Sequence, residues 1–387
     1  MAFNKKSDVV VVGAGPVGLL TAISLKAAGL DVRIFDAGRR TVVHSYALVL
    51  HSATLDLLDR VGLGAACVEA GRVVKQLGVY EGGAARGQLE LANLPGPYPY
   101  VVVLPQSRLE SILESELEKR GLTVEWGHRV QGLEPSGGNV GLSVARLDKV
   151  STGYPVAHTE VVVDKLYEMS AHYVVAADGY DSFVRRRLGI PFEDQGPAQL
   201  YAVFQFETDG DAPQEGRLLV GDRRVGGYWP LPDGRCRFSF PVESAEEPGT
   251  GPARLTELIA SRAPWFAARV GAIEWTALAL FERKVAASFG EGRIWMAGDA
   301  GHITSPLGAQ SMNVGLREGA DLADRIIRVS RQDADAALLA DYGASRVAEW
   351  QTLTRVDAGG GALRSLLRPC IPASGADLES LLGQLAN

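Results

Sequence analysis

The stretch Val9-Val10-Val11-Val12-Gly13-Ala14-Gly15-Pro16-Val17-Gly18 decides the fold of this chain. A run of valines is typical of a buried parallel strand, and the Gly-x-Gly-x-x-Gly turn after it opens an Ala/Leu-rich segment that ends at Gly29. The next apolar run, Val32 to Asp36, predicts a second strand with an acidic residue at its end. This order of strand, glycine turn, helix, strand and acid is typical of a dinucleotide-binding unit, whereas an ordinary glycine-rich turn would not account for all of it.

Each glycine of the turn has a physical role in such a unit. Gly13 allows the tight turn, Gly15 lets the backbone approach a pyrophosphate, and Gly18 lets the helix pack closely on the strand. The free N–H groups and the positive dipole at the helix N-terminus favour phosphate binding there. Asp36 is the expected partner of a ribose.

Composition and charge exclude several classes of protein. The 387 residues carry a net charge of −7, and the longest basic cluster is Arg185-Arg186-Arg187, which argues against a nucleic-acid-binding surface. That cluster predicts a solvated helix face or a contact with cofactor phosphate. Cys67, Cys236 and Cys370 are scattered and odd in number, so neither a disulfide framework nor a metal site is indicated. No signal peptide or integral membrane span is visible, and we expect a cytoplasmic protein.

Two further strands are predicted to end in an Asp-Gly or Gly-Asp pair. Tyr173 to Ala177 leads into Asp178-Gly179, and Arg293 to Ala297 leads into Gly298-Asp299. Ligands bind at the carboxyl ends of strands in doubly wound sheets, so both pairs are candidate ligand contacts.

Helices are expected outside the first unit as well. Ser107-Arg108-Leu109-Glu110 has the Ser-x-x-Glu pattern of a capping box, which predicts an amphipathic helix ending near Gly121. A long helix is expected after Asn313, to about Arg331. Asp148 to Tyr154 is expected to be a loop, and Gly359-Gly360-Gly361 a loose connection before a final helix at 377–385.

The remaining segments alternate in the manner of antiparallel strands, with one helix near 255–261. We therefore expect an α/β fold in which a Rossmann-like dinucleotide-binding domain is interlocked with a smaller, mostly antiparallel-sheet substrate domain. The expected limits are 1–72, 100–184 and 286–345 for the first domain and 73–99 and 185–285 for the second. Residues 346–387 would form a C-terminal helical tail.

Three motifs, taken in order, resemble those of the single-component FAD-dependent aromatic hydroxylases of the para-hydroxybenzoate hydroxylase fold. They are Gly13 to Gly18, the run D-G-Y-D-S-F-V-R-R-R-L-G-I from Asp178, and the run G-D-A-G-H-I-T-S-P-L-G-A-Q-S-M-N from Gly298. The resemblance covers nearly the whole chain. It implies that the Rossmann-like domain is an FAD-binding domain of the GR2 type. It also implies bound FAD, NADPH or NADH as a transient reductant, O₂ as co-substrate and an aromatic small molecule as substrate, in a monomer or a homodimer.

The resemblance also implies roles for single residues. Asp36 would bind the adenosine ribose, Gln106 and Arg108 would lie along the ribityl and phosphate part, and Asp299 would bind the ribityl chain. Asp178 belongs to a motif used for both FAD and the nicotinamide cofactor. The loop Pro306, Leu307 and Gly308 would pass the flavin ring, with no side chain assigned to catalysis. The expected cofactor-binding residues are Gly13, Gly15, Pro16, Val17, Gly18, Asp36, Ala37, Gln106, Arg108, Val130, Asp178, Gly298, Asp299, Pro306, Gly308, Met312 and Asn313.

The chain departs from the family pattern at several points. Tyr46 stands where the family often has an arginine close to the flavin, and Ala309 and Ser311 replace frequent glycines. Many relatives also carry a C-terminal thioredoxin-like domain, for which too few residues follow about Ser345. The chain therefore resembles the short, two-domain form.

The chemistry that the resemblance implies is flavin-borne. NAD(P)H would reduce FAD, O₂ would add as a C4a-hydroperoxide, and the substrate would attack its distal oxygen. The helix N-terminus near Met312-Asn313 would stabilise negative charge on the reduced ring. The alternatives are an FAD-dependent halogenase, whose frequent Trp-x-Trp-x-Ile-Pro signature is absent, a flavin oxidoreductase of the geranylgeranyl reductase type, and a flavoprotein without enzymatic activity.

Candidates for direct substrate contact are few. Tyr228 and Trp229 could line the substrate cavity by aromatic stacking, although an aromatic residue on a strand is more often part of the core. The phenylalanines of 204–206 and 238–240 could serve either role. His302 follows Gly298-Asp299, where a histidine is more often structural than catalytic.

Overall fold

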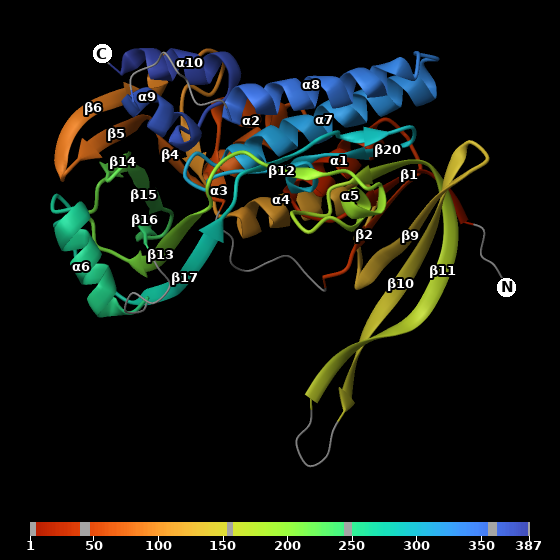
Figure 1. The fold of residues 1–387 in the computed structure, drawn as a ribbon, viewed down its shortest axis with the longest axis horizontal. Helices are drawn as coiled ribbons and strands as arrows, with labels where there is room; N and C mark the ends of the chain where they lie inside the picture. The colour runs from red at the N-terminus through yellow and green to blue at the C-terminus, as the bar shows by residue number, and fades with distance from the viewer. Residues whose placement is uncertain (1–4, 39–46, 153–157, 244–249, 355–361, 386–387) are drawn as a thin grey trace.

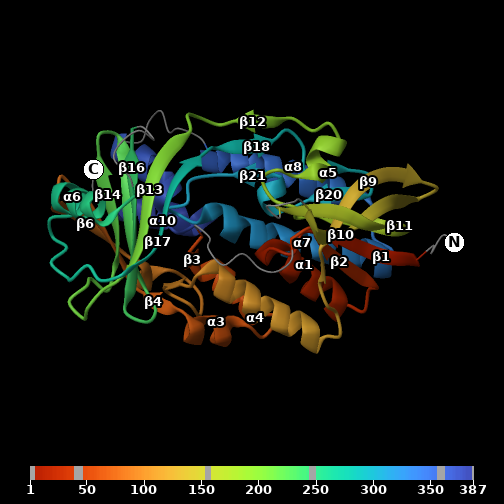
Figure 2. The ribbon, with the colours of Figure 1, turned by 90° about the horizontal axis from the view of Figure 1, so that it is seen from below.

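The structure, a computed structural model, describes residues 5–38, 47–152, 158–243, 250–354 and 362–385. Two sheets organise these residues, one within a body of helices and the other beside it (Figures 1 and 2). Tyr46 and the Gly359–Gly361 connection, which carried expectations, lie outside the described residues. No helix within the described ranges is both long enough and apolar enough to cross a membrane.

The first sheet contains the predicted dinucleotide-binding strands. Strand β1 (Lys5–Val12) lies between β2 (Val32–Asp36) and the end of β11 (His158–Ala176), and all three run parallel. The full order is β19-β20-β11-β1-β2-β8, with the outer members β8 (Glu125–Trp126), β19 (Gly290–Glu291) and β20 (Ile294–Met296). Val9, Val10 and Val11 have no exposed surface, which confirms a strand buried on both faces.

An antiparallel meander branches from β11, an interior strand of this sheet. It consists of β9 (His128–Ser136), β10 (Asn139–Thr152) and β11, and the ribbon of β10 and β11 projects far from the body (Figure 1). The predicted loop at 148–154 is therefore wrong as far as Thr152, because β10 stays paired with β11 to that residue. Asp148 and Lys149 are exposed in a solvated ribbon, so their polarity is compatible with strand pairing.

Helices cover the first sheet, and α1 (Pro16–Ala27) packs on both α4 (Gln106–Lys119) and α7 (Gln310–Arg331). Helix α8 (Ala337–Thr354) runs beside α7 (Figure 1). The predicted helices are confirmed, but the capping box is wrong. Helix α4 begins at Gln106 with Pro105 at its N-cap, so Ser107 lies inside the helix and its side chain caps nothing.

The second sheet has the order β17-β13-β16-β15-β14-β5-β6 and is antiparallel except between β14 and β5. Helix α6 (Pro252–Arg262) covers its outer side (Figure 2). The strands are β5 (Gln76–Glu81), β6 (Ala84–Glu90), β13 (Gln199–Glu207), β14 (Gly216–Gly221), β15 (Arg224–Leu231), β16 (Arg235–Val242) and β17 (Ile273–Phe281). The expected α/β fold with a mostly antiparallel second sheet is confirmed.

Short elements connect the two parts. Two three-stranded sheets contain β3 (Val49–Leu50), β7 (Val101–Val103) and β4 (Arg72–Val74), and β12 (Phe192–Asp194), β18 (Lys284–Ala286) and β21 (His302–Ile303). The short helices are α2 (Ser52–Asp59), α3 (Gly64–Ala70), α5 (Phe183–Arg187), α9 (Ala362–Leu367) and α10 (Gly375–Gln384), with 3-10 turns at 91–93, 298–300 and 368–370. Helix α8 continues across residue 345, and the domain limits given above stay a prediction.

Candidate cofactor and substrate site

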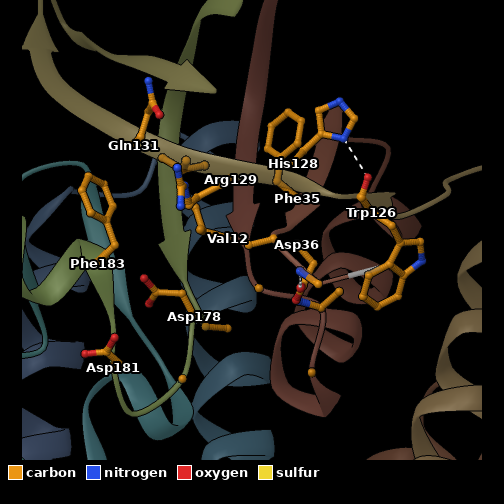
Figure 3. Close-up of a pocket in the computed structure, with 18 of the residues that line it drawn as sticks. Val12, Phe35, Asp36, Trp126, His128, Arg129, Gln131, Asp178, Asp181 and Phe183 are labelled. Carbon is orange, nitrogen blue, oxygen red and sulfur yellow. Dashed lines mark hydrogen bonds between the residues drawn. The ribbon is translucent and has the colours of Figure 1, made fainter. Parts of the chain in front are cut away.

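A cavity of about 800 Å³ lies at the carboxyl ends of β1, β2 and β11 (Figure 3). This is the edge of a parallel sheet where ligands bind in doubly wound folds, and the volume is within the range of ligand pockets. Asp36 and Asp178 lie on different sides of the end of β1, as Figure 3 shows. The cavity therefore brings the glycine turn, the end of the second strand and the Asp-Gly pair into one place.

The glycines of the turn differ in what surrounds them. A Cβ atom on Gly13, whose φ is +99°, would lie 2.2 Å from the Ala177 carbonyl oxygen, and one on Gly18 would lie 2.0 Å from the Gly13 oxygen. Among the described residues, no atom outside the immediate chain neighbours of Gly15 lies within 4 Å of the corresponding position. Gly13 and Gly18 are thus required by packing, whereas Gly15 faces open space that a ligand backbone contact would need.

The helix that follows offers its first N–H groups to the cavity. Gly15 is the N-cap of α1, Pro16 is in its first turn, and no side chain caps the helix. Such uncapped N–H groups and the helix dipole favour a phosphate. This geometry fits the pyrophosphate of a dinucleotide.

Asp36 is held at the cavity rim by two backbone donors. The N–H of Ala14 donates to its Oδ2 at 2.8 Å, and the N–H of Gly38 donates to its Oδ1 at 2.6 Å. Each carboxylate oxygen can accept a further hydrogen bond, so Asp36 can still bind ribose hydroxyls. Ala37 also lines the cavity.

Asp178 presents a carboxylate oxygen that lacks a partner among the described residues. Its Oδ2 accepts the N–H of Val184 at 3.1 Å, whereas its Oδ1 is buried without a hydrogen bond. Burial raises the pKa of Asp178, and hydrogen bonds from Ser182 and from backbone N–H groups oppose that rise. A buried acceptor without a donor is costly, and a hydroxyl or amide of a bound ligand would satisfy it.

The arginine cluster after Asp178 divides among different roles. Arg185 is only 5 % exposed and donates to the carbonyl oxygens of Ala300 and Tyr180, both at 2.8 Å. Arg185 therefore connects the Asp178 turn to the Gly298–Ala300 turn. This role differs from both predictions for the cluster, a solvated helix face and a contact with cofactor phosphate. Arg186 lines the cavity and pairs with Asp181.

The two α4 residues expected at the cofactor, Gln106 and Arg108, differ in whether they line the cavity. Gln106 lines the cavity, as does Val130 of β9. Arg108 lines neither this cavity nor the next, because its guanidinium donates to the Ala70 carbonyl at 3.1 Å and pairs with Asp233. The expected contact between Arg108 and the cofactor therefore has no support in this geometry.

Other lining residues were not foreseen from the sequence. Trp126, His128 and Arg129, at the end of β8 and the start of β9, line the cavity, with Trp126 and His128 on the side of Phe35 and Asp36 (Figure 3). The sequence contained little indication of these residues, because β8 has only two residues and pairs only with the last two residues of β2.

A second cavity, of about 430 Å³, begins where the first ends. Gln106 lines both, and the second is also lined by Asp299, Pro306 and Met312. Desolvation by the surrounding protein raises the pKa of the Asp299 carboxyl. The side chain is nevertheless exposed to the cavity. Ala309 and Ser311, the two departures from the family pattern, line it too. Ala309 has a φ of +49°, a backbone conformation that favours glycine.

The Gly298-Asp299 turn is fixed by a buried carboxylate that sequence reasoning missed. Glu318 of α7 has no exposed surface. Its carboxylate accepts hydrogen bonds from the Gly298 N–H at 2.9 Å, from Nε2 of His302 at 2.8 Å and from the Trp350 indole N–H at 2.7 Å. Burial raises the pKa of Glu318, but these partners outweigh burial and lower it below its ordinary value. His302 is itself fully buried, as a structural histidine would be.

The loop beside the second cavity is held from behind. Asn313 accepts the N–H of His51 at 2.8 Å and donates to the carbonyls of Val49 and Ala309 at 2.7 and 2.8 Å. The His51 ring donates from Nε2 to the Gly308 carbonyl at 2.7 Å. Burial lowers the pKa of His51 to about 3, so the ring is neutral. Asn313 and Gly308 thus shape the cavity through the backbone and do not line it.

The two aromatic candidates for substrate contact lie on opposite faces of β15. Trp229 is nearly buried and borders a void of only about 10 Å³, together with Pro306, Leu307, Arg237 and Ser239. Tyr228 packs on the outer side against Phe238, Trp265 and Phe266, and its hydroxyl donates to the Pro213 carbonyl at 2.9 Å. Side chains alternate between the faces of a strand, so adjacent residues could not both face the cavity. Tyr228 as a substrate contact is wrong.

The family comparison agrees with this geometry. Residues 6–357 match the model of the FAD-binding-domain family, described as "FAD binding domain". The chain belongs to this family, and its resemblance to FAD-dependent aromatic hydroxylases is confirmed.

Several named relatives are similar along most of this chain. It is 29 % identical over 348 residues to 6-methylpretetramide 4-monooxygenase of Streptomyces rimosus, which covers 88 % of this chain and 59 % of the relative. It is 25 % identical to pentachlorophenol 4-monooxygenase of Sphingobium chlorophenolicum, with 89 % and 62 % covered. The chain therefore spans about 60 % of the length of these relatives.

The fold also matches a solved structure over nearly its whole length. The crystal structure of p-nitrophenol 4-monooxygenase from Pseudomonas putida superimposes with a TM-score of 0.76, at 21 % identity, over 98 % of this chain and 93 % of that one. This similarity concerns the fold.

Proposed function

We propose that the chain is an FAD-dependent monooxygenase that uses NADH or NADPH and O₂ to hydroxylate an aromatic or polyketide-like small molecule. The observation that carries the proposal is the pair of cavities that meet at Gln106, one at the glycine turn and one beside Pro306 and the second sheet. A dinucleotide cofactor with a ring at its far end requires such an extended site.

The residues present fit FAD. Gly15 and the α1 N-terminus would hold the pyrophosphate, Asp36 the adenosine ribose, and Asp178 with its unpaired Oδ1 a polar group of the central part. Asp299 would bind the ribityl chain and Pro306 would lie beside the ring. Bound FAD would supply the activation of dioxygen after reduction by the nicotinamide cofactor.

The chain itself would orient the reactants and adjust the local charge. The N-terminal turn of α7 reaches the second cavity through Ser311 and Met312, so its N–H groups and dipole would stabilise negative charge there. Leu307 packs closely against β15: a Cβ atom added to Gly227 of that strand would lie 2.8 Å from Cδ2 of Leu307. This contact would help to exclude water from the space between the ring-side loop and the second sheet.

The substrate would lie between that loop and the inner face of the second sheet. Trp229 offers an aromatic surface there, and Arg237, 5 % exposed, donates to Gln205 at 2.7 Å and lies over the Trp275 ring. The relatives' names concern a pretetramide and pentachlorophenol, which supports a phenol or an aromatic polyketide as the substrate class.

The test is oxygen transfer from labelled dioxygen. The purified protein, loaded with FAD, is supplied with NADH or NADPH, ¹⁸O₂ and a panel of phenols and aromatic polyketides. Substrate-stimulated reductant oxidation with one ¹⁸O atom in the product is expected. Reductant oxidation with no labelled product in the panel, and a reduced or halogenated product instead, would contradict the monooxygenase proposal.

A further inference from the structure

The loop that runs past the second cavity is bonded to the C-terminal part of the chain. Gln310, 1 % exposed, directs its side-chain amide at three carbonyl oxygens: those of Arg368 at 3.1 Å, Ile371 at 3.5 Å and Ala373 at 3.2 Å. An amide NH₂ group has two hydrogens, so the three acceptors share them. One side chain thus connects the first turn of α7 to the segment between α9 and α10.

The same segment packs directly on the backbone of the loop. A Cβ on Gly308 would lie 2.6 Å from the Pro369 carbonyl oxygen and 2.9 Å from that of Ile371. The Gly308 carbonyl is held from its other side by His51. Gly308 is therefore enclosed between His51 and residues 369–371, so displacement of the segment would leave the loop without support on one side.

The far end of the C-terminal segment is attached to the second sheet. Gln384 of α10 accepts the Glu90 N–H at 2.7 Å and donates to the Glu90 carbonyl at 3.2 Å. Figure 1 shows α10 beside β6, the strand that Glu90 ends. Between these ends, Arg368 forms an ion pair with Glu379, which ties the 3-10 turn to α10. The segment thus spans from the loop of the second cavity to the sheet that would hold the substrate.

We propose that residues 362–385 form a C-terminal strap that positions the ring-side loop, and that Gln310 is the positioning residue through which the strap acts. This inference rests on the proposed function, because it places the flavin ring at that loop. Gln310 lines neither cavity, and it acts through its neighbours Ala309 and Met312, which line the second one. Strap packing and FAD binding are then energetically coupled, and the coupling is reciprocal.

The test measures hydrogen exchange of the strap with and without FAD. The full chain is prepared as wild type, as Gln310→Met, which keeps the length of the side chain but removes its donors, and as Gln351→Met, an exposed glutamine of α8 that serves as control. In the wild type and the control, FAD is expected to slow exchange of the amides in 362–373 about tenfold. In Gln310→Met the slowing is lost, the FAD dissociation constant rises about tenfold, and the visible flavin band changes shape.

Three results would overturn the inference. One is a wild type that binds FAD with no change in strap exchange. Another is a Gln310→Met variant that keeps the flavin spectrum, the FAD affinity and the strap protection of the wild type. This result would count against the inference even if the variant unfolds at a lower temperature, because Gln310 would then have only a structural role. The third is a wild type that shows no flavin absorbance after reconstitution with FAD. This result would contradict the proposed function itself, and the missing absorbance distinguishes it from the other two. Should Gln310→Met fail to fold, the wild-type comparison decides, together with Gln384→Met at the far end of the strap.

Discussion

The two halves of the site are built in different ways. The nucleotide-side cavity is centred on one continuous unit, which supplies the glycine turn and Asp36, and it is completed by α4, by the ends of β8, β9 and β11, and by the turn after Asp178. The ring-side cavity is assembled from segments far apart in the chain, and its loop is supported by His51, Asn313 and the strap. A local sequence pattern therefore specifies the centre of the first half, the glycine turn and Asp36, whereas tertiary contacts of buried polar side chains support the loop of the second.

The largest expected effect concerns the glycine turn. Gly18→Ala would place a Cβ 2.0 Å from the Gly13 oxygen, so the strand and helix must separate. We expect loss of FAD binding by at least about 100-fold together with destabilisation of about 3 kcal/mol or more, measured by flavin titration and urea unfolding.

The matched variant is Gly15→Ala, whose Cβ would meet no atom of the described residues within 4 Å apart from its chain neighbours. It should unfold at the same urea concentration as the wild type while binding FAD more weakly. Equal behaviour of the two variants in both assays would remove the distinction between a packing glycine and a ligand glycine.

The next effect is a pH dependence of stability that originates on the ring side. The pKa of His51 is about 3 in the folded protein because of burial, against about 6.5 when it is unfolded. As the pH falls from 6.5 towards 3, the unfolded chain binds a proton there that the folded chain does not. Stability should therefore fall by about 1.4 kcal/mol for each pH unit from this residue alone.

His51→Gln cannot titrate and can still donate to Gly308. Its free energy of unfolding, measured in urea between pH 7 and pH 4.5, should depend on pH with a slope smaller by about one proton. An unchanged slope would mean that burial does not keep His51 neutral in the folded protein.

A smaller effect separates the two faces of β15. Trp229→Ala should raise the KM for the aromatic substrate about tenfold and leave FAD affinity unchanged, because Trp229 lies between the second sheet and Pro306. Tyr228→Phe removes a hydroxyl that bonds only to the Pro213 carbonyl among the described residues, so its KM should match the wild type. Steady-state kinetics with both variants checks this, and a KM effect of Tyr228→Phe as large as that of Trp229→Ala would contradict the assignment of faces.

The smallest expected effect is that of Arg108→Ala. Since the guanidinium bonds Ala70 and Asp233 away from both cavities, FAD affinity should change less than about twofold. A tenfold loss of affinity in the flavin titration would restore the role that family resemblance implied for Arg108.

Sequence patterns predicted the parts of the fold that depend on local periodicity. Val9–Val12, the glycine turn and the acidic end of β2 lie where expected, since strand burial and turn geometry are encoded within a few residues. The roles of Glu318 and Gln310 were not predicted, because each depends on partners distant in sequence, namely Trp350 and the segment 368–373. Arg108 shows the same limit: a helix was predicted there, but the position of Arg108 in the sequence did not show that its side chain turns to Ala70 and Asp233.

The central claim is that the two cavities form one site for FAD, with the nucleotide half at the glycine turn and the ring beside Pro306. A crystal structure of the chain with FAD tests it most directly. We predict a pyrophosphate at the N-terminus of α1, a ribose on Asp36, and the flavin ring in the 430 Å³ cavity between Met312 and the second sheet. A cofactor bound only through its adenine half, or a ring located elsewhere, would contradict the account.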